Sequence, residues 1–132
     1  MSSDNGGTIL AQRFKQALQQ TEQSRDPSAV ASLFRGGARL TNLGGDHGTD
    51  ATKFWQIYLD QFSDIRSDFT GEITSDGTAA LEWQSRGTLA DGRPVEYRGV
   101  SAIEFDNDAV TSFRTYYDSA AFVRTKTQYS PD

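Results

Sequence analysis

Three turn signals at regular spacing in the second half of the chain constrain its fold more than any other feature. Asp76-Gly77 and Asp91-Gly92 are dipeptides typical of tight hairpins, and Asp106-Asn107-Asp108 is a third turn signal. They separate four strand candidates, over about residues 65–74, 78–89, 95–105 and 109–118. Because such short connections join antiparallel neighbours, this half is predicted to form one antiparallel meander.

The first half carries helical patterns instead. Leu10, Phe14, Ala17, Leu18 and Thr21 fall on one helical face. A second helix is predicted from Asp26-Pro27 to the glycines at 36 and 37, and a third over 51–62, with Thr49 or Asp50 as its cap. A short strand at 38–43 and a glycine-rich loop at 44–48 lie between them. Helices followed by an antiparallel sheet predict an α+β fold.

Length and composition set the class of protein. The 132 residues suit one domain, 1–132, and we expect residues 1–7 and 124–132 to be flexible tails. The net charge of −5, with both signs interspersed, argues against a nucleic-acid partner. No apolar run approaches the roughly 20 residues of a membrane span. The sequence has no cysteine and one histidine, so we expect no metal or other cofactor and a cytoplasmic protein.

The turns also predict which strand residues share a face. With 74 opposite 78, 89 opposite 95 and 105 opposite 109, one row across the sheet holds Ser67, Ser85, Gly99 and Thr115. The neighbouring rows hold Phe69, Trp83, Ser101 and Phe113, and Ile65, Gly87, Tyr97 and Tyr117. The remaining inward rows hold Gly71, Leu81, Ile103 and Thr111, and Ile73, Ala79, Phe105 and Ala109. Small polar side chains between large aromatic ones leave space, so this inward face predicts a pocket bounded by Trp83 and Tyr117. The bland alternative is that the aromatic side chains are ordinary core.

The opposite face of the meander is charged, with a small apolar centre. It is predicted to form a homodimer, and its central residues are Arg98, Val100, Ala102, Arg114 and Tyr116. The alternative is that this face meets water, as charged faces of antiparallel sheets commonly do.

The order of elements resembles the nuclear transport factor 2-like superfamily, which includes SnoaL-like polyketide cyclases, ketosteroid isomerases and limonene epoxide hydrolase. The residues that carry the resemblance are Leu33-Phe34 before the first strand, Gly48 before the third helix, and the ending Phe113-Arg114-Thr115-Tyr116-Tyr117-Asp118. It covers about residues 8–123. The resemblance implies a cone-shaped barrel, made of a curved antiparallel sheet packed on three N-terminal helices. It also implies an internal cavity and dimers through the outer sheet face.

The catalytic residues of these relatives match this chain poorly. Asn42 resembles the asparagine of limonene epoxide hydrolase, and it lies near the position of the base aspartate of ketosteroid isomerase. Where the hydrolase has an arginine and two aspartates, this chain has Trp83, Ser85 and Thr115. The predicted pocket therefore includes Asn42 but no inward carboxylate. Its full set is Phe14, Asn42, Trp55, Tyr58, Phe69, Trp83, Ser85, Tyr97, Phe113, Thr115 and Tyr117.

Two residues are candidates for acid–base catalysis. Asp118 ends the last strand, where family cyclases resemble it in having an acid, and it could take a proton next to a carbonyl group. His47 is the only histidine and lies on the glycine-rich loop beside Asp46 and Asp50. The alternatives are a surface aspartate that closes a strand and a solvated loop histidine.

Two functions stay open from the sequence. One is an isomerase, cyclase or hydratase that acts on an apolar carbonyl compound by acid–base chemistry without a metal. The other is a non-catalytic protein that binds a small apolar molecule or serves as a dimeric scaffold.

Overall fold

The computed structural model describes residues 2–123, with side chains from Ile9 onward. Its helices are α1 (Ser2–Ser24), α2 (Ser28–Ala31), α3 (Ala51–Asp60) and the 3-10 helix η1 (Ser119–Phe122). Its strands are β1 (Phe34–Asn42), β2 (Gly45–Asp46), β3 (Phe62–Ser75), β4 (Thr78–Leu89), β5 (Pro94–Asp106) and β6 (Ala109–Tyr117). The expected tail at 124–132 lies outside the described residues. The other expected tail is largely helical, because α1 begins at Ser2.

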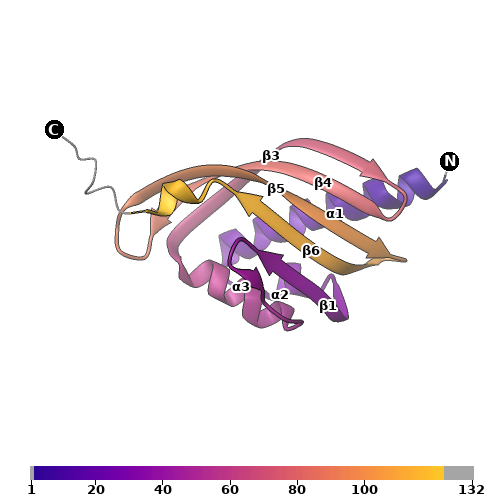
Figure 1. The fold of residues 1–132 in the computed structure, drawn as a ribbon, viewed down its shortest axis with the longest axis horizontal. Helices are drawn as coiled ribbons and strands as arrows, with labels where there is room; N and C mark the ends of the chain where they lie inside the picture. Colours follow the sequence, from indigo (N-terminus) through magenta and orange to yellow (C-terminus); the bar gives the residue numbers. More distant parts are fainter. Residues whose placement is uncertain (1, 124–132) are drawn as a thin grey trace.

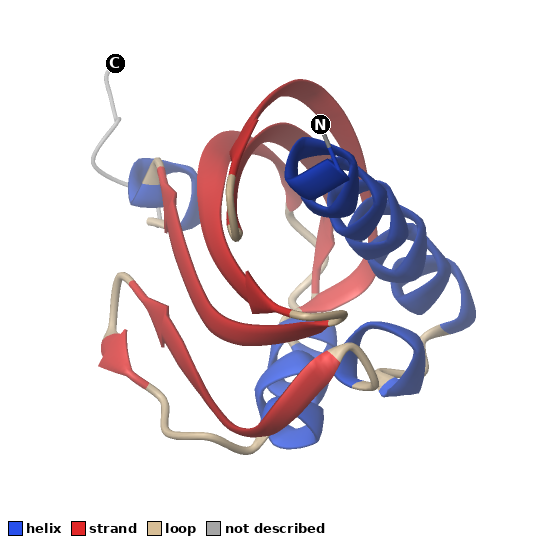
Figure 2. Ribbon diagram, turned by 90° about the vertical axis from the view of Figure 1, so that its right-hand side faces the viewer, coloured by secondary structure: helices blue, strands red, loops and turns tan. Residues whose placement is uncertain are grey.

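The strands form one curved sheet in the order β2-β1-β6-β5-β4-β3. The four long strands β3 to β6 are antiparallel neighbours, as the turns predicted. The first strand β1 pairs with β6 in parallel, so the sheet is mixed. Figure 2 shows the strands curling into a partial cone, with α1 along one side and α3 below. This is the expected α+β architecture of helices packed on a curved sheet (Figure 1).

The helix boundaries follow their caps, with one correction. Asp50 caps α3 by accepting a hydrogen bond of 3.0 Å from the backbone nitrogen of Lys53, as predicted. Asp26 accepts a bond of 2.9 Å from the nitrogen of Ser28 at the start of α2. The prediction that α2 continues to the two glycines was wrong. The helix ends at Ala31, and both glycines lie inside β1, where Gly37 has φ +88°, a conformation that glycine adopts without strain.

The predicted register is correct for one half of the first hairpin. Phe69 lies opposite Trp83 and Ser67 opposite Ser85. An irregularity between Phe69 and Gly71 then shifts the pairing by one residue, so that Ile73 lies opposite Ala80. Because a one-residue shift turns a side chain to the other face, Ile73 is 74% exposed rather than inward.

The other two hairpins are each displaced by two residues from the predicted register. Trp83 lies opposite Gly99 instead of Ser101, and Ser101 lies opposite Thr115 instead of Phe113. Side chains alternate with a period of two along a strand, so a shift of two keeps a residue on its predicted face. The hydroxyl side chains therefore still face inward, but they lie opposite different residues than predicted. Near the β5–β6 turn, however, an irregularity between Glu104 and Phe105 reduces the displacement to one residue, and Val110 is buried instead of facing outward.

The core lies between α1, α3 and the inner face of the sheet. Phe113 on β6 stacks on Phe14 of α1 at a ring distance of 5.7 Å. It also meets Trp55 of α3 edge-on at 5.2 Å. These contacts hold both helices against the sheet.

Candidate functional site

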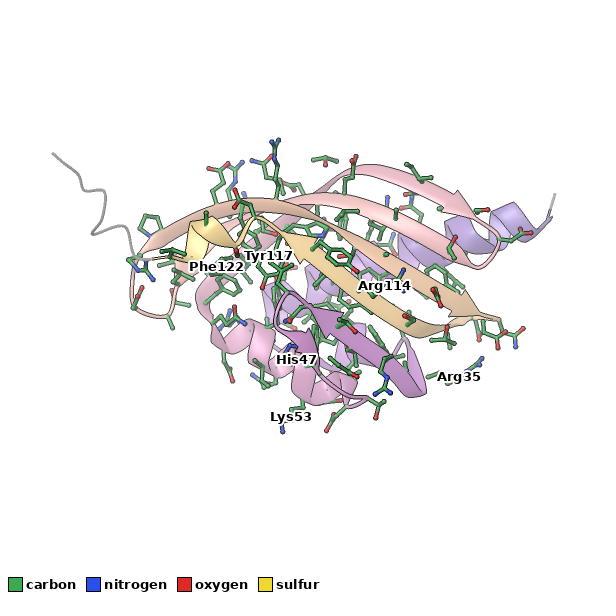
Figure 3. All side chains as sticks on the ribbon, in the orientation of Figure 1. Arg35, His47, Lys53, Arg114, Tyr117 and Phe122 are labelled. Atoms are coloured by element: carbon green, nitrogen blue, oxygen red, sulfur yellow. The ribbon has the colours of Figure 1, made fainter. Side chains whose placement is uncertain are left out.

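An internal cavity of about 310 Å³ lies between α3, the inner sheet face and η1. Its described lining residues are Leu18, Asn42, His47, Asp50, Lys53, Phe54, Trp55, Ile57, Tyr58, Gln61, Ser67, Trp83, Ser85, Tyr97, Ser101, Phe113, Thr115, Tyr117 and Phe122. In Figure 3, Tyr117 and Phe122 lie close together at one end, and His47 comes from the β1–β2 hairpin. The volume is near the lower end of the range for small-molecule sites, about 300–1,000 Å³.

Most residues predicted to line a pocket do line this cavity, but two do not. Phe14 is 1% exposed and lies in the core, and Phe69 packs against that core. Neither belongs to the cavity wall. Both lie toward the end of the sheet that α1 covers, so their rings fill space there instead of bounding it. Phe122 belongs to the wall but was missed, because no pattern indicated that η1 folds back over the sheet.

The inward hydroxyl groups bind one another in pairs. Ser67 Oγ lies 2.6 Å from Ser85 Oγ, and Ser101 Oγ lies 3.0 Å from Thr115 Oγ1. Trp83 Nε1 donates a bond of 3.0 Å to Ser101 Oγ. Buried polar groups need such partners. The result is an aromatic wall that carries two small polar sites.

A buried carboxylate stands behind the Ser67–Ser85 pair. Glu22 of α1 is 4% exposed, and its Oε2 accepts hydrogen bonds from Tyr58 Oη at 2.6 Å and from Ser67 Oγ at 2.7 Å. Its Oε1 accepts a bond of 2.8 Å from the backbone nitrogen of Ser67. Burial raises the pKa of Glu22, and the hydrogen bonds from Ser67 and Tyr58 offset part of that rise.

Sequence reasoning missed Glu22, although a signal existed. Phe14, Leu18 and Glu22 are spaced by four residues, so the glutamate continues the apolar face of α1. A carboxylate at such a position needs polar partners inside the protein. The sequence could not identify those partners, because Tyr58 and Ser67 lie on other elements.

Two tyrosines of the cavity wall stay protonated well into the alkaline range. Burial raises the pKa of Tyr58, and the nearby charge of Glu22 raises it further. Burial likewise raises the pKa of Tyr97, followed by the effect of Tyr117. Both phenols therefore present neutral hydroxyl groups at neutral pH.

At the other side of the cavity, His47 is paired with Asn42. His47 Nε2 lies 2.7 Å from Asn42 Oδ1, and the same oxygen accepts a bond of 2.7 Å from the backbone nitrogen of Gly44. Since the backbone donor identifies the amide oxygen, Nε2 must carry a hydrogen. In the neutral ring Nδ1 is then the basic atom. The ring also packs edge-on against Phe54, with centroids 5.7 Å apart.

The structure does not place Asp118 in the cavity wall, contrary to the expected position at its mouth. Its side chain is exposed and accepts a hydrogen bond of 3.0 Å from the backbone nitrogen of Ala120, which caps η1. The strand ends at Tyr117, so Asp118 belongs to the turn into η1. Of the two catalytic candidates, the structure brings only His47 to the cavity.

The described residues lack two other kinds of site. Within residues 2–123, no group of three or more histidine, cysteine, aspartate or glutamate side chains could hold a metal ion. None of the helices described there is long and apolar enough to cross a membrane.

Comparisons with known proteins support the fold. The model of the SnoaL-like domain family matches residues 11–113. The chain is similar to a nuclear transport factor 2-like protein from Anabaena variabilis, at 16% identity and a TM-score of 0.82, covering 92% of this chain and 95% of that one. No curated protein sequence gives a significant match.

Two further solved structures carry functional descriptions of their own. A proposed SnoaL-like polyketide cyclase from Jannaschia sp. CCS1 has 13% identity and a TM-score of 0.78, and the match covers 92% of each chain. A protein with a ketosteroid isomerase-like fold from Catenulispora acidiphila, solved in complex with trimethylamine, has 14% identity and a TM-score of 0.73. That match covers 89% of this chain and 97% of the other. At such identities the likeness shows a shared fold.

Proposed function

This chain belongs to the SnoaL-like domain family, and we propose that its cavity binds a small, largely apolar carbonyl compound and performs acid–base chemistry on it. The observation that carries the proposal is the wall itself. Aromatic side chains surround two hydroxyl pairs in a cavity of about 310 Å³. An apolar wall with a few placed polar groups is the usual lining of a site for a small organic molecule.

His47 is the acid–base group of this proposal. With its Nε2 hydrogen bonded to Asn42, the neutral ring offers Nδ1 as the base that takes a proton from the carbon next to the carbonyl group. The electron pair of the broken C–H bond moves to the carbonyl oxygen. The Ser101–Thr115 pair, which needs only one of its two hydroxyl hydrogens for its own bond, stabilises the enolate by hydrogen bonding. In a ketone with a carbon–carbon double bond next to the deprotonated carbon, the enolate extends over the double bond, and return of the proton to its far end moves the double bond and completes an isomerisation.

A second candidate is binding without catalysis. Asp50 is the one carboxylate among the described lining residues, and it is engaged as the cap of α3. By its resemblance to limonene epoxide hydrolase, the chain also has Trp83, Ser85 and Thr115 at the positions expected for the charged catalytic residues of that enzyme. A cavity that lacks a free carboxylate can still hold an apolar ligand.

The experiment that tests both candidates uses 2-tetralone, a two-ring ketone whose hydrogens next to the carbonyl exchange with solvent. Quenching of the fluorescence of Trp55 and Trp83, which line the cavity, measures binding. Proton NMR in D₂O measures exchange. We expect saturable binding, and an exchange rate that falls by about a hundredfold or more in His47→Gln, while the affinity stays unchanged. The matched control is Lys53→Gln, which changes another polar lining residue.

The outcomes separate the candidates. Binding without enhanced exchange supports the non-catalytic function. Exchange that persists in His47→Gln contradicts the role of the histidine, and a wild-type protein that binds no two-ring compound contradicts the proposed function as a whole.

A further inference from the structure

Glu22 has a place in the structure that the chemistry proposed for His47 does not use. It is the buried carboxylate behind the cavity wall, and among the described residues no cation lies within ion-pair distance of it. Arg25, which follows the C-terminus of the helix that carries Glu22, donates to the backbone oxygens of Leu59 and Phe62 instead. A buried carboxylate without a counter-ion is costly, so a structural or functional reason for keeping it is required.

The hydrogen bonds of Glu22 have a defined direction. When it is ionised, Tyr58 and Ser67 both donate to Oε2. Their hydrogens are then committed to the carboxylate, and the bond between Ser67 and Ser85 must take its hydrogen from Ser85. All three hydroxyl-bearing residues line the cavity. With their hydrogens used inside the wall, they have only lone pairs left for a ligand.

Protonation of Glu22 reverses this direction. A protonated carboxyl group can donate its own hydrogen to one of the two hydroxyl oxygens that previously donated to it. The hydrogen of that hydroxyl is released and becomes available to a ligand. The same wall then binds an acceptor, such as a carbonyl oxygen, in place of a donor.

We propose that Glu22 is a positioning residue that sets the hydrogen-bonding polarity of Tyr58, Ser67 and Ser85, so that the cavity takes ligand hydroxyl groups when Glu22 is ionised and carbonyl groups when it is protonated. This inference rests on the proposed function, because it assigns ligand classes to the same cavity. It goes further in making the specificity of the cavity depend on a residue that does not line it.

The charged and titratable surroundings of Glu22 come from the turn after its own helix and from four other elements. They are Arg25 in that turn, Tyr58 on α3, Asp64, Arg66 and Asp68 on β3, Arg86 on β4, and Glu96 and Tyr97 on β5. Burial is the main cause that raises the pKa of Glu22, and the negative charge of Asp68 adds to it. Both favour the protonated carboxyl group.

A purely structural role is the competing explanation. Together with Gln19, whose Nε2 donates 3.1 Å to the oxygen of Ser67, Glu22 covers both backbone groups of Ser67 on the free edge of β3. Covering an edge strand prevents pairing with other chains. That role would affect stability and would leave the choice between donor and acceptor ligands unchanged.

The test measures binding of three two-ring probes: 2-naphthol as a hydrogen-bond donor, 2-tetralone as an acceptor and naphthalene as neither. Dissociation constants are measured from pH 5 to 8 by fluorescence quenching. For the wild type, the preference for 2-naphthol over 2-tetralone should rise with pH by roughly fivefold, the worth of one net hydrogen bond. In Glu22→Gln, whose amide hydrogens imitate the protonated acid, this preference should stay low at every pH.

Two further variants keep the proposal falsifiable if Glu22→Gln folds poorly. Tyr58→Phe removes one hydroxyl and should reduce the pH dependence of the preference, with both dissociation constants expressed relative to that of naphthalene in the same variant. Asp108→Asn, which changes an exposed carboxylate in the turn between β5 and β6, is the matched control and should behave as wild type. A pH-dependent preference that persists in Glu22→Gln, or is absent from the wild type although naphthalene binds, overturns the proposal.

A second measurement separates this inference from the proposed function. In protein labelled with ¹³C, the Tyr58 Cζ signal should titrate with the same midpoint as Glu22 Cδ. If no probe binds but this joint titration is present, the proposed function fails and the control of Tyr58 by Glu22 stands. If the Tyr58 signal does not follow Glu22, the inference fails whatever binds.

Discussion

Gly99 on β5 lies directly opposite Trp83 on β4, and the indole ring covers it. A Cβ atom at Gly99 would fall 2.7 Å from Cζ2 of Trp83 and would also clash with the backbone oxygen of Tyr116. The missing side chain therefore lets the tryptophan ring lie along the sheet and lets its Nε1 reach Ser101.

The first prediction follows from this contact. Gly99→Ala should destabilise the protein by about 1–3 kcal/mol, the usual cost of overpacking, because a backbone oxygen and a ring must both move. The emission of Trp83 should shift as well. Urea unfolding and fluorescence measure both effects. Gly36→Ala is the control, since a Cβ there meets nothing within 4 Å; equal losses in the two variants would contradict the prediction.

The second prediction concerns the pH dependence of stability. The pKa of Glu22 is raised from its ordinary value of 4.5, so the folded state binds this proton more tightly than the unfolded chain does. Its contribution is fully present below the unfolded pKa and is lost as the pH rises through the folded pKa, at up to about 1.4 kcal/mol per pH unit. The free energy of unfolding of the wild type should therefore fall, relative to that of Glu22→Gln, as the pH rises from 4 to 8.

Asp26 provides a contrast of opposite sign. Hydrogen bonds from Ser28 lower its pKa, so its contribution is present above the unfolded pKa and is lost as the pH falls through the folded one. The difference in unfolding free energy between the wild type and Asp26→Asn should therefore become smaller at acid pH. If the stability of Asp26→Asn relative to the wild type changed with pH in the same direction as that of Glu22→Gln, the two stability differences would not reflect the individual carboxylates.

The third prediction tests the cap of α3. Asp50→Ala removes the acceptor for the nitrogen of Lys53 and should cost about 1 kcal/mol of stability. Because α3 supplies one wall of the cavity, binding of 2-tetralone should also weaken. Thermal unfolding and the same titration measure this. The control is Asp60→Ala, which removes an exposed carboxylate at the other end of the helix. Its stability and its affinity for 2-tetralone should stay near those of the wild type.

The fourth prediction concerns assembly, which the single chain leaves as a proposal. The outer face of the meander carries half-buried Val100 and Ala102, exposed Tyr116 and the ion pair of Arg114 with Glu104. We expect this face to form a two-fold dimer that buries more than about 1,000 Å² in total. Sedimentation at micromolar concentration should give a dimer for the wild type and a monomer for Arg98→Glu with Val100→Asp. A monomeric wild type would refute the prediction.

The strands were the most predictable part of the fold. β4 begins at Thr78 and ends at Leu89, the bounds that the two flanking turn signals predicted. Turn chemistry is local, because it depends on which residues tolerate the backbone angles of the turn. The inward face was equally predictable, because alternation along a strand is local too.

The exact pairing was less predictable. The irregularity after Phe69 exposes Ile73, and the irregularity near Phe105 brings Val110, at 1% exposure, into the core. A bulge adds one residue to one strand of a pair. Nothing within β3 or β6 alone indicates where it forms, because its position depends on the curvature that the helices impose.

For the site, the sequence determined which types of side chain are present, and the tertiary structure decided which of them meet. The sequence by itself determined an α+β chain with a meander whose inner face alternates hydroxyl and aromatic side chains, because composition and period along a strand are written in the chain. Only the tertiary structure decided that Asp118 turns away to cap η1, that His47 meets Asn42 across a hairpin, and that Glu22 meets Tyr58. The physical reason is distance along the chain: Glu22 and Tyr58 are 36 residues apart, and a hydrogen bond between them exists only once packing has removed both from water.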